Sequence, residues 1–275
     1  YIKLCGRLGY HTLTVKPFVE FSDQAYELVS YFQSRQLYGA VEFHKRYDES
    51  NIVARDIVSS GDIGRLSSVV VEYSQKITVP TKIFRKWAHK TNIFQYLGVH
   101  YVDQVAFVTA AAPTRVMAVG TSSKLNSLGI DSYDEIIATV EWALGDNTFF
   151  AVYRVGWIDN ESSTAMSTQR ISYYGTEGYL HLDQTNRGIE LLGKSSVQHI
   201  NPYFSQTYGN SDQGVYSRGY GITSIKSFLE DVIAIFTGEE ELGDLQKKRP
   251  SFAESVVSVA VSEAVSMSLV GGSQW

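Results

Sequence analysis

Residues 10–17 read Tyr-His-Thr-Leu-Thr-Val-Lys-Pro, and this stretch decides how the chain begins to fold. Apolar and β-branched residues alternate up to Val15, which predicts a short strand that ends at Lys16-Pro17. Residues 1–6 read as the end of a helix, and Ser22-Asp23 can cap a following helix that runs to about Ser34. In open α/β sheets of this kind, ligands bind outside the carboxyl ends of the strands. We therefore expect Lys16 beside a binding site.

From residue 39 onward, consecutive strands replace the alternation of helix and strand. Turn signals such as Gly145-Asp146-Asn147 join neighbouring strands, which favours an antiparallel sheet. Strands followed by helices indicate an α+β fold with the helices on one face of the sheet. The predicted strands cover residues 39–47, 66–73, 115–121, 135–144, 148–156, 169–174, 179–182 and 189–192, and the predicted helices cover 49–60, 92–108, 223–236 and 251–269.

Composition argues against several classes of protein. The chain has 275 residues, a mean hydropathy of −0.12, and no apolar run that approaches the roughly 20 residues of a membrane-spanning helix. The net charge of −5 and the scattered basic residues argue against nucleic acid as a partner. The first residues show no signal peptide, and a single cysteine, Cys5, fits a reducing compartment. We therefore expect a cytoplasmic protein that binds neither membrane nor nucleic acid.

The predicted helix over residues 92–108 carries a candidate acid/base. Tyr96, His100 and Asp103 are spaced i, i+4, i+7 and share one face, while apolar residues fill mainly another. A histidine among polar neighbours suits proton transfer, because its pKa lies near neutrality. From spacing alone, a structural histidine at a domain surface is the simpler interpretation.

Five motifs, in order along the chain, resemble those of the glucose-fructose oxidoreductase / inositol dehydrogenase (Gfo/Idh/MocA) family. Thr14-Val-Lys16-Pro17 resembles the family's Glu-Lys-Pro motif, and Tyr96-Leu-Gly-Val-His100-Tyr-Val-Asp103 resembles its Asp-x-Gly-x-His-x-x-Asp helix. The other three are His44-Lys-Arg46-Tyr-Asp48 with Ile57-Val-Ser-Ser-Gly61-Asp-Ile-Gly64, Tyr174-Gly-Thr-Glu-Gly178, and Gly219-Tyr-Gly221 through Phe228. No single motif is decisive, but together they are specific.

The resemblance implies a fold of two parts. Residues 1–39 would be the C-terminal remnant of a dinucleotide-binding Rossmann domain. Residues 40–275 would form an open-faced, mostly antiparallel β-sheet domain with helices on one face, which binds substrate and mediates oligomerisation. We therefore expect the fold class α+β, with a Rossmann remnant in front. A sheet with an uncovered face usually needs a partner, so we expect a homodimer or homotetramer formed through that face.

The resemblance also implies an activity. It is hydride transfer between NAD or NADP and a secondary alcohol or ketone of a sugar, sugar nucleotide or polyol. Lys16 would orient the hydroxyl and help to shuttle its proton, and His100 would be the general acid/base. A lysine beside the oxygen stabilises alkoxide character. Lys16 and Pro17 would also contact the cofactor.

Two positions depart from the family pattern. Tyr96 replaces the family's usual aspartate, and Val15 replaces the glutamate before the lysine. A tyrosine whose pKa is lowered by a nearby lysine can take a proton, so we count Tyr96 among the catalytic residues. The two changes indicate altered substrate choice or lost catalysis. A sugar- or dinucleotide-sensing regulator and a structural oligomerising module therefore remain alternatives.

Further candidate substrate contacts lie around the same helix and at the ends of other elements. A tryptophan in this region can stack on a sugar face, although a core position is equally consistent with the sequence. An arginine that ends a strand near the domain junction more often forms a structural ion pair. The candidate substrate-binding residues are Trp87, Asn92, Gln95, Asp103, Tyr220 and Arg46.

The sequence contains no recognisable motif for binding the diphosphate of a dinucleotide. No Gly-x-Gly-x-x-Gly motif follows a strand and opens a helix in these 275 residues, although the diphosphate of a dinucleotide needs close backbone approach at a helix N-terminus. We therefore expect this segment alone to bind no dinucleotide. The six histidines show no paired ligand spacing, so we expect no metal site.

Overall fold

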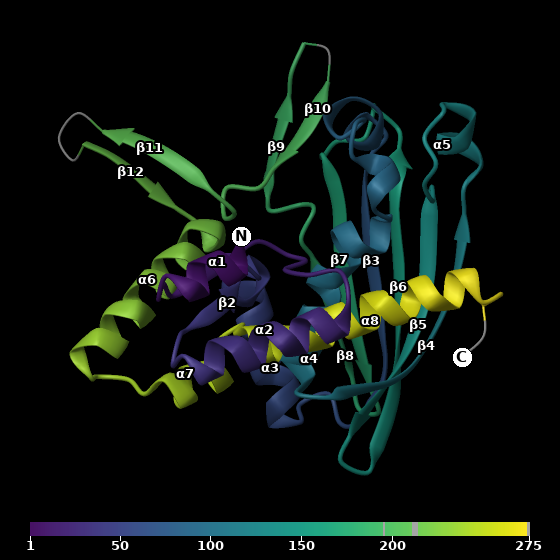
Figure 1. Ribbon diagram of the computed structural model, residues 1–275. Coiled ribbons are helices and arrows are strands. Elements are labelled where there is room, and N and C mark those ends of the chain that lie inside the picture. The colour runs from purple at the N-terminus through teal and green to yellow at the C-terminus, as the bar shows by residue number, and fades with distance from the viewer. Residues whose placement is uncertain (195, 211–213, 274–275) are drawn as a thin grey trace.

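A six-stranded sheet organises the larger part of the chain in the computed structural model, which describes residues 1–194, 196–210 and 214–273 (Figure 1). The strand order is β4-β5-β6-β3-β7-β8. Among these strands only β3 and β6 pair in parallel, so the prediction of a mostly antiparallel sheet is confirmed. The strands are β3 (Leu66–Lys76), β4 (Ala112–Thr121), β5 (Glu135–Leu144), β6 (Asn147–Asp159), β7 (Ser167–Gly175) and β8 (Tyr179–Asp183).

Helices α4 (Val99–Thr109) and α8 (Phe252–Val270) pack on one face of this sheet, and α3 (Glu49–Ser60) packs on α4 (Figure 1). Alternate residues of β5 and β6 are buried under them, as the period of two requires. The strongest local signals set the helix ends. The Asp48 side chain accepts a hydrogen bond from the Ser50 amide before α3, and Gly61 closes that helix with φ of 83°.

The first 41 residues form a small α/β unit with its own two-stranded sheet. Helix α1 (Ile2–Arg7) precedes β1 (Thr12–Thr14), and α2 (Ser22–Ser34) connects β1 to β2 (Gly39–Val41). The two strands pair in parallel, from Thr12 opposite Gly39 to Thr14 opposite Val41. Helix α2 and the start of α8 cover one face of the pair, and α6 (Tyr220–Thr237) and α7 (Leu242–Lys248) cover the other. This β-α-β arrangement matches the alternation predicted for the segment.

The remaining elements connect these layers or project from them. Two β-hairpins, β9–β10 and β11–β12, extend away from the body of the molecule (Figure 1). The elements are η1 (His44–Tyr47), η2 (Val79–Ile83), η3 (Ala88–Lys90), η4 (Phe94–Gly98), α5 (Ser123–Ser127), β9 (Ile189–Leu192), β10 (Val197–Ile200), β11 (Gln206–Asn210), β12 (Gly214–Arg218), α6 (Tyr220–Thr237) and α7 (Leu242–Lys248).

Two local predictions were wrong. The strand predicted over residues 39–47 ends at Val41, and the 3-10 turn η1 follows, because Lys45 and Arg46 turn inward to buried hydrogen-bond partners. Ser22 is the first residue of α2 and does not cap it. Its hydroxyl instead donates to the carboxylate of Glu263, which ties α2 to α8.

Helix α8 corrects the expectation that no segment is long and apolar enough to cross a membrane. By length and composition Phe252–Val270 could do so, and it is the one such helix among the described residues. It packs against α2, α4 and β4, and Val259, Val261 and Val265 are buried there. A core helix of a folded domain passes the same test, and its packing places α8 in that class.

None of the helices in the described residues covers the second face of the six-stranded sheet. Val119, Ile137 and Phe150 lie on it with exposed fractions of 47%, 40% and 40%. Charged pairs between neighbouring strands surround them, such as Arg154 with Glu135 at 2.5 Å. The predicted open face is therefore present.

Candidate active site

Lys16 lies just beyond the carboxyl end of β1 and reaches towards η4. Its ammonium group donates a hydrogen bond to the backbone oxygen of Tyr96 and lies 4.4 Å from the centre of the Tyr96 ring. Burial lowers the pKa of Lys16 to about 8, although the negative charge of Glu42 acts in the opposite direction. The lysine can thus exchange a proton near neutral pH.

His100 lies in the first turn of α4 and is only 4% exposed. Burial, together with the charges of Lys16, His44 and Lys45, holds its pKa well below the ordinary value. The ring is therefore neutral at pH 7 and can accept a proton. Its Nδ1 atom is buried without a hydrogen-bond partner among the described residues. A buried polar atom of this kind usually marks a place where a ligand or water binds.

A second histidine, His44 from η1, lies beside His100 with ring centres 4.9 Å apart. The carboxylate of Glu42 lies 2.9 Å from His44 Nδ1 and also accepts a hydrogen bond of 2.7 Å from the hydroxyl of Ser224. This carboxylate fixes the orientation of the His44 ring. The sequence analysis did not include His44 among the candidate site residues. The signal that could have indicated it is the run of charged residues directly after a buried strand.

These groups open into one cavity of about 700 Å³. Lys16, Pro17, Trp87, Tyr96, His100 and Tyr220 all line it, so the structure brings six predicted site residues together. Trp87 is 40% exposed and meets the Tyr96 ring edge-on at 5.8 Å, which leaves ring surface available for stacking. The remaining lining residues are Val15, His44, Tyr73, Gln75, Leu97, Ala165, Met166, Ser167, Gln169, Gln184, Thr185, His199, Asn201 and Phe204.

Tyr96 lines the cavity, but its pKa is raised and not lowered as the sequence argument expected. Burial raises its pKa, and a hydrogen bond with Gln75 only partly offsets that rise. The lysine does not lower the tyrosine pKa, because its ammonium group lies over the ring face and bonds to the backbone oxygen. Tyr96 is therefore a wall of the cavity that holds Lys16.

Arg46 and Asp103 do not line the cavity. They form a bidentate ion pair with a closest distance of 2.6 Å, and their side chains are 8% and 2% exposed. The pair connects η1 to α4 below the site. The two residues thus form a buried ion pair, which is the interpretation that the sequence favoured for Arg46, and their contact with substrate stays a prediction.

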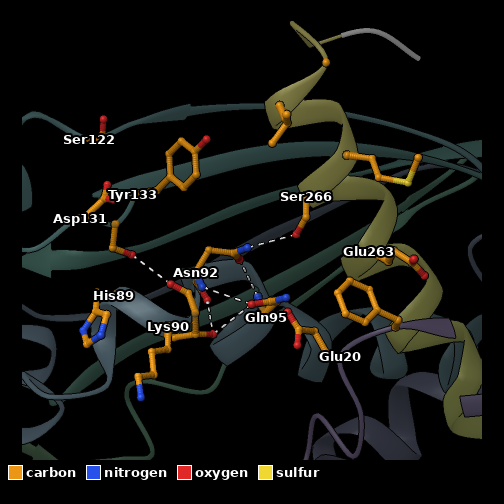
Figure 2. Close-up of a pocket in the computed structure, with 16 residues that line it drawn as sticks. Glu20, His89, Lys90, Asn92, Gln95, Ser122, Asp131, Tyr133, Glu263 and Ser266 are labelled. Carbon is orange, nitrogen blue, oxygen red and sulfur yellow. Dashed lines mark hydrogen bonds between the residues drawn. The ribbon is translucent and has the colours of Figure 1, made fainter. Parts of the chain in front are cut away.

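Asn92 and Gln95 line a different cavity, of about 810 Å³, next to α8 (Figure 2). The Asn92 amide group donates to the Ser266 hydroxyl at 3.2 Å, and its oxygen accepts from the Gln95 backbone amide at 2.9 Å. Both polar groups of the Asn92 side chain are therefore already hydrogen-bonded within the protein. Asn92 and Gln95 therefore lie apart from the cavity of Lys16 and His100, because the π-helical turn η4 shifts the helical register between Gln95 and His100. Their contact with substrate stays a prediction.

Metal ligation finds no support in the described residues, which contain no cluster of three or more His, Cys, Asp or Glu side chains able to hold an ion. Lys16, His44 and His100 instead form a compact set of nitrogen-bearing side chains around one cavity. Such a set can hold a hydroxyl group and accept or return its proton.

Comparison with known proteins gives a family match. Residues 52–181 match the family model of the GFO/IDH/MocA C-terminal domain. This is the family that the motifs of the chain resemble. No curated protein matches the chain significantly.

Solved inositol dehydrogenases share the fold. The scyllo-inositol dehydrogenase of Lactobacillus casei, solved with bound NAD(H) and scyllo-inositol, superposes with a TM-score of 0.72 at 14% identity, over 98% of this chain and 75% of that one. The myo-inositol 2-dehydrogenase of Lactobacillus plantarum gives 0.68 at 17% identity, over 98% and 74%. The myo-inositol dehydrogenase of Corynebacterium glutamicum gives 0.69 at 16%, over 98% and 75%. At these identities the likeness establishes the fold.

Proposed function

We propose that this chain supplies the substrate-binding and proton-transferring part of an NAD(P)-dependent oxidoreductase that acts on a secondary alcohol or ketone of a sugar, sugar nucleotide or polyol. The observation that carries the proposal is the meeting of Lys16 and His100 in one cavity of about 700 Å³. The two residues come from segments 84 positions apart, and each has a pKa lowered by burial. The match to the family model supports the same reaction class.

Each side chain has a separate task in this proposal. Oxidation of a secondary alcohol removes a hydride from carbon and a proton from oxygen, and a nicotinamide held beside Lys16 and Pro17 would supply the hydride acceptor. Neutral His100 accepts the hydroxyl proton, and the Lys16 ammonium stabilises negative charge on the oxygen as the proton leaves. In reduction of the ketone, His100 returns the proton.

The described residues fit the nicotinamide end of such a cofactor. Lys16 and Pro17 line the cavity at the carboxyl end of β1, where a sheet of this type presents its ligand. We propose residues 1–39 as the C-terminal part of the dinucleotide-binding domain and residues 40–275 as the substrate domain. The glycine-rich phosphate-binding motif is not among the 275 residues, so activity is to be sought in the full-length gene product.

The test is an assay of that gene product with NAD+ and with NADP+ against inositols and aldohexoses. We expect nicotinamide reduction with at least one of them, and a loss of about 100-fold or more in kcat in Lys16→Met and His100→Asn. Lys226→Met and His181→Asn make the same changes at exposed positions and should retain activity. Turnover that survives in both cavity variants would refute the proposal. Tight sugar binding without turnover would favour the sensing regulator.

We also propose that the open sheet face forms a homodimer or homotetramer. Val119, Ile137 and Phe150 give this face an apolar centre, and charged pairs at its edges give it a polar rim, as at many protein interfaces. Ile137→Lys should lower the mass measured by light scattering. An unchanged mass would argue for another interface.

A further inference from the structure

Lys45 is a buried cation behind the wall of the cavity. It is 1% exposed, and its ammonium group donates to the side-chain oxygens of Gln169 and Gln184 at 2.7 and 2.9 Å. A longer contact of 3.4 Å reaches the hydroxyl of Tyr101. In the described part of the chain, no carboxylate oxygen lies within 4.0 Å of Lys45 or of Lys16. Buried charges in proteins are usually paired, so the absence of a carboxylate here needs a reason.

The hydrogen bonds around Lys45 fix the orientation of both glutamines. An ammonium group only donates, so each glutamine must present its oxygen to Lys45 and its NH2 group elsewhere. The Gln184 NH2 group donates to the side-chain oxygen of Asn51 at 2.7 Å. Gln169 lines the cavity, and its NH2 group has no partner among the described residues. That group is therefore a donor available to a ligand.

The described lining of the cavity contains basic side chains but no acidic ones. Among the described lining residues there is no aspartate or glutamate, whereas Lys16, His44, His100 and His199 are all present. The nearby acids are already engaged: Glu42 by His44 and Ser224, and Asp48 by Arg187. Glu190 likewise contacts His199 at 3.3 Å. A ligand in this cavity thus meets hydrogen-bond donors and the positive charge of Lys16, with the ammonium group of Lys45 behind the wall.

We propose that the cavity takes an anionic sugar derivative, whose carboxylate or phosphate group receives the Gln169 amide in the field of Lys45 while a hydroxyl group lies by Lys16 and His100. The placement of the hydroxyl rests on the proposed function. The preference for an anion rests on the cavity alone. Anionic oxygen is the acceptor that such a set of donors favours, because charge-assisted hydrogen bonds are about twice as strong as neutral ones.

The test is calorimetric titration of the protein, without nucleotide, with D-glucuronate, D-glucose 6-phosphate and D-glucose. Glucuronate and glucose share a ring and differ only at C6. We expect at least one anion to bind about tenfold or more tighter than glucose, with a preference that shrinks between about 0.05 and about 0.5 M salt. The stronger anion identifies carboxylate or phosphate as the group preferred. Glucose binding as tightly as both anions overturns the proposal.

Gln169→Glu gives a direct variant. A carboxylate at this position still accepts the hydrogen bond from Lys45, so the network is retained, but it places a negative charge where the ligand anion would lie. We expect the anion preference to disappear in Gln169→Glu and to persist in Gln33→Glu, which makes the same change on an exposed face of α2. An unchanged preference in folded Gln169→Glu contradicts the proposal.

Proton uptake gives a readout on the unmodified protein, which covers the case in which Gln169→Glu fails to fold. Burial lowers the pKa of Lys45 to about 7, and a bound anion should raise it. Binding of the tighter anion at pH 7.5 should therefore take up protons, seen as a heat that depends on the buffer. Binding without uptake counts against the proposal. Anion binding without any turnover would contradict the proposed function but not this inference. Turnover of neutral polyols without anion binding would contradict this inference but not the proposed function.

Discussion

The ammonium nitrogen of Lys16 lies 4.4 Å from the centre of the Tyr96 ring and donates a hydrogen bond to the Tyr96 backbone oxygen. A ring face and a carbonyl attract a cation more weakly than a carboxylate does. Burial therefore dominates and lowers the pKa of Lys16 to about 8. The lysine can then both stabilise charge and exchange a proton.

Tyr96→Asp should raise the pKa of Lys16 above about 8, because a carboxylate beside the ammonium group favours its charged form. The measurement is the rate at which acetic anhydride labels Lys16 as a function of pH, followed by mass spectrometry. Tyr96→Phe is the matched control, since it keeps the ring and the backbone oxygen. If Tyr96→Phe and Tyr96→Asp shift the pKa of Lys16 equally, the ring and the backbone oxygen of residue 96 do not determine that pKa.

His100 should make the protein sensitive to acid. Its pKa is held well below 6.5 in the fold, so the unfolded chain binds a proton that the native state does not as pH falls below about 6.5. The free energy of unfolding should therefore fall with pH, by at most about 1.4 kcal/mol per pH unit from this one group. Urea unfolding between pH 7.5 and 5.5 should show a shallower decline in His100→Gln. The exposed His181→Gln should retain the wild-type slope.

The sequence predicted the regular elements best where local and tertiary signals agree. Helix α3 and strands β5 and β9 have the predicted bounds, and Asp48 and Gly61 at the ends of α3 show why. It failed where a buried charge decides the path. The strand predicted over residues 39–47 ends early because Lys45 and Arg46 turn into the interior. Their hydrogen-bond acceptors there are far away in the sequence, so a pattern of alternating polarity cannot reveal them.

The sequence also predicted some residues of the candidate site and missed others. Lys16 and His100 were found because each belongs to a motif that spacing preserves, and the fold brings them to one cavity. Asn92 and Gln95 were assigned because they flank the His100 helix where the family places substrate contacts, and the sequence could not show that the π-helical turn η4 separates them from His100. His44 and Lys45 are neighbours in η1, whereas Gln169 lies in β7, and only the tertiary structure shows that these two segments meet beside the cavity.

Removing Arg46 should destabilise the protein without removing a cavity contact. Arg46→Met leaves Asp103 buried and unpaired, which costs about 3–5 kcal/mol. The double variant Arg46→Met/Asp103→Leu removes both charges and should recover much of that loss. Urea unfolding measures all three proteins. If the double variant is as unstable as the single, the unpaired carboxylate is not the cause.

Gly175 and Gly178 offer a matched test of close packing in the Tyr174–Gly178 turn. A Cβ atom on Gly175 would lie 1.9 Å from the backbone oxygen of Ile63, whereas one on Gly178 would first meet Ile63 side-chain carbon at 3.5 Å. Backbone cannot move aside as a side chain can, so Gly175→Ala must displace β7 from the Ile63 segment. Overpacking of this kind typically costs about 1–3 kcal/mol, and we expect Gly175→Ala to lower the thermal midpoint clearly. Gly178→Ala should leave it almost unchanged, and equal midpoints for the two variants would show that Ile63 does not enforce the glycine.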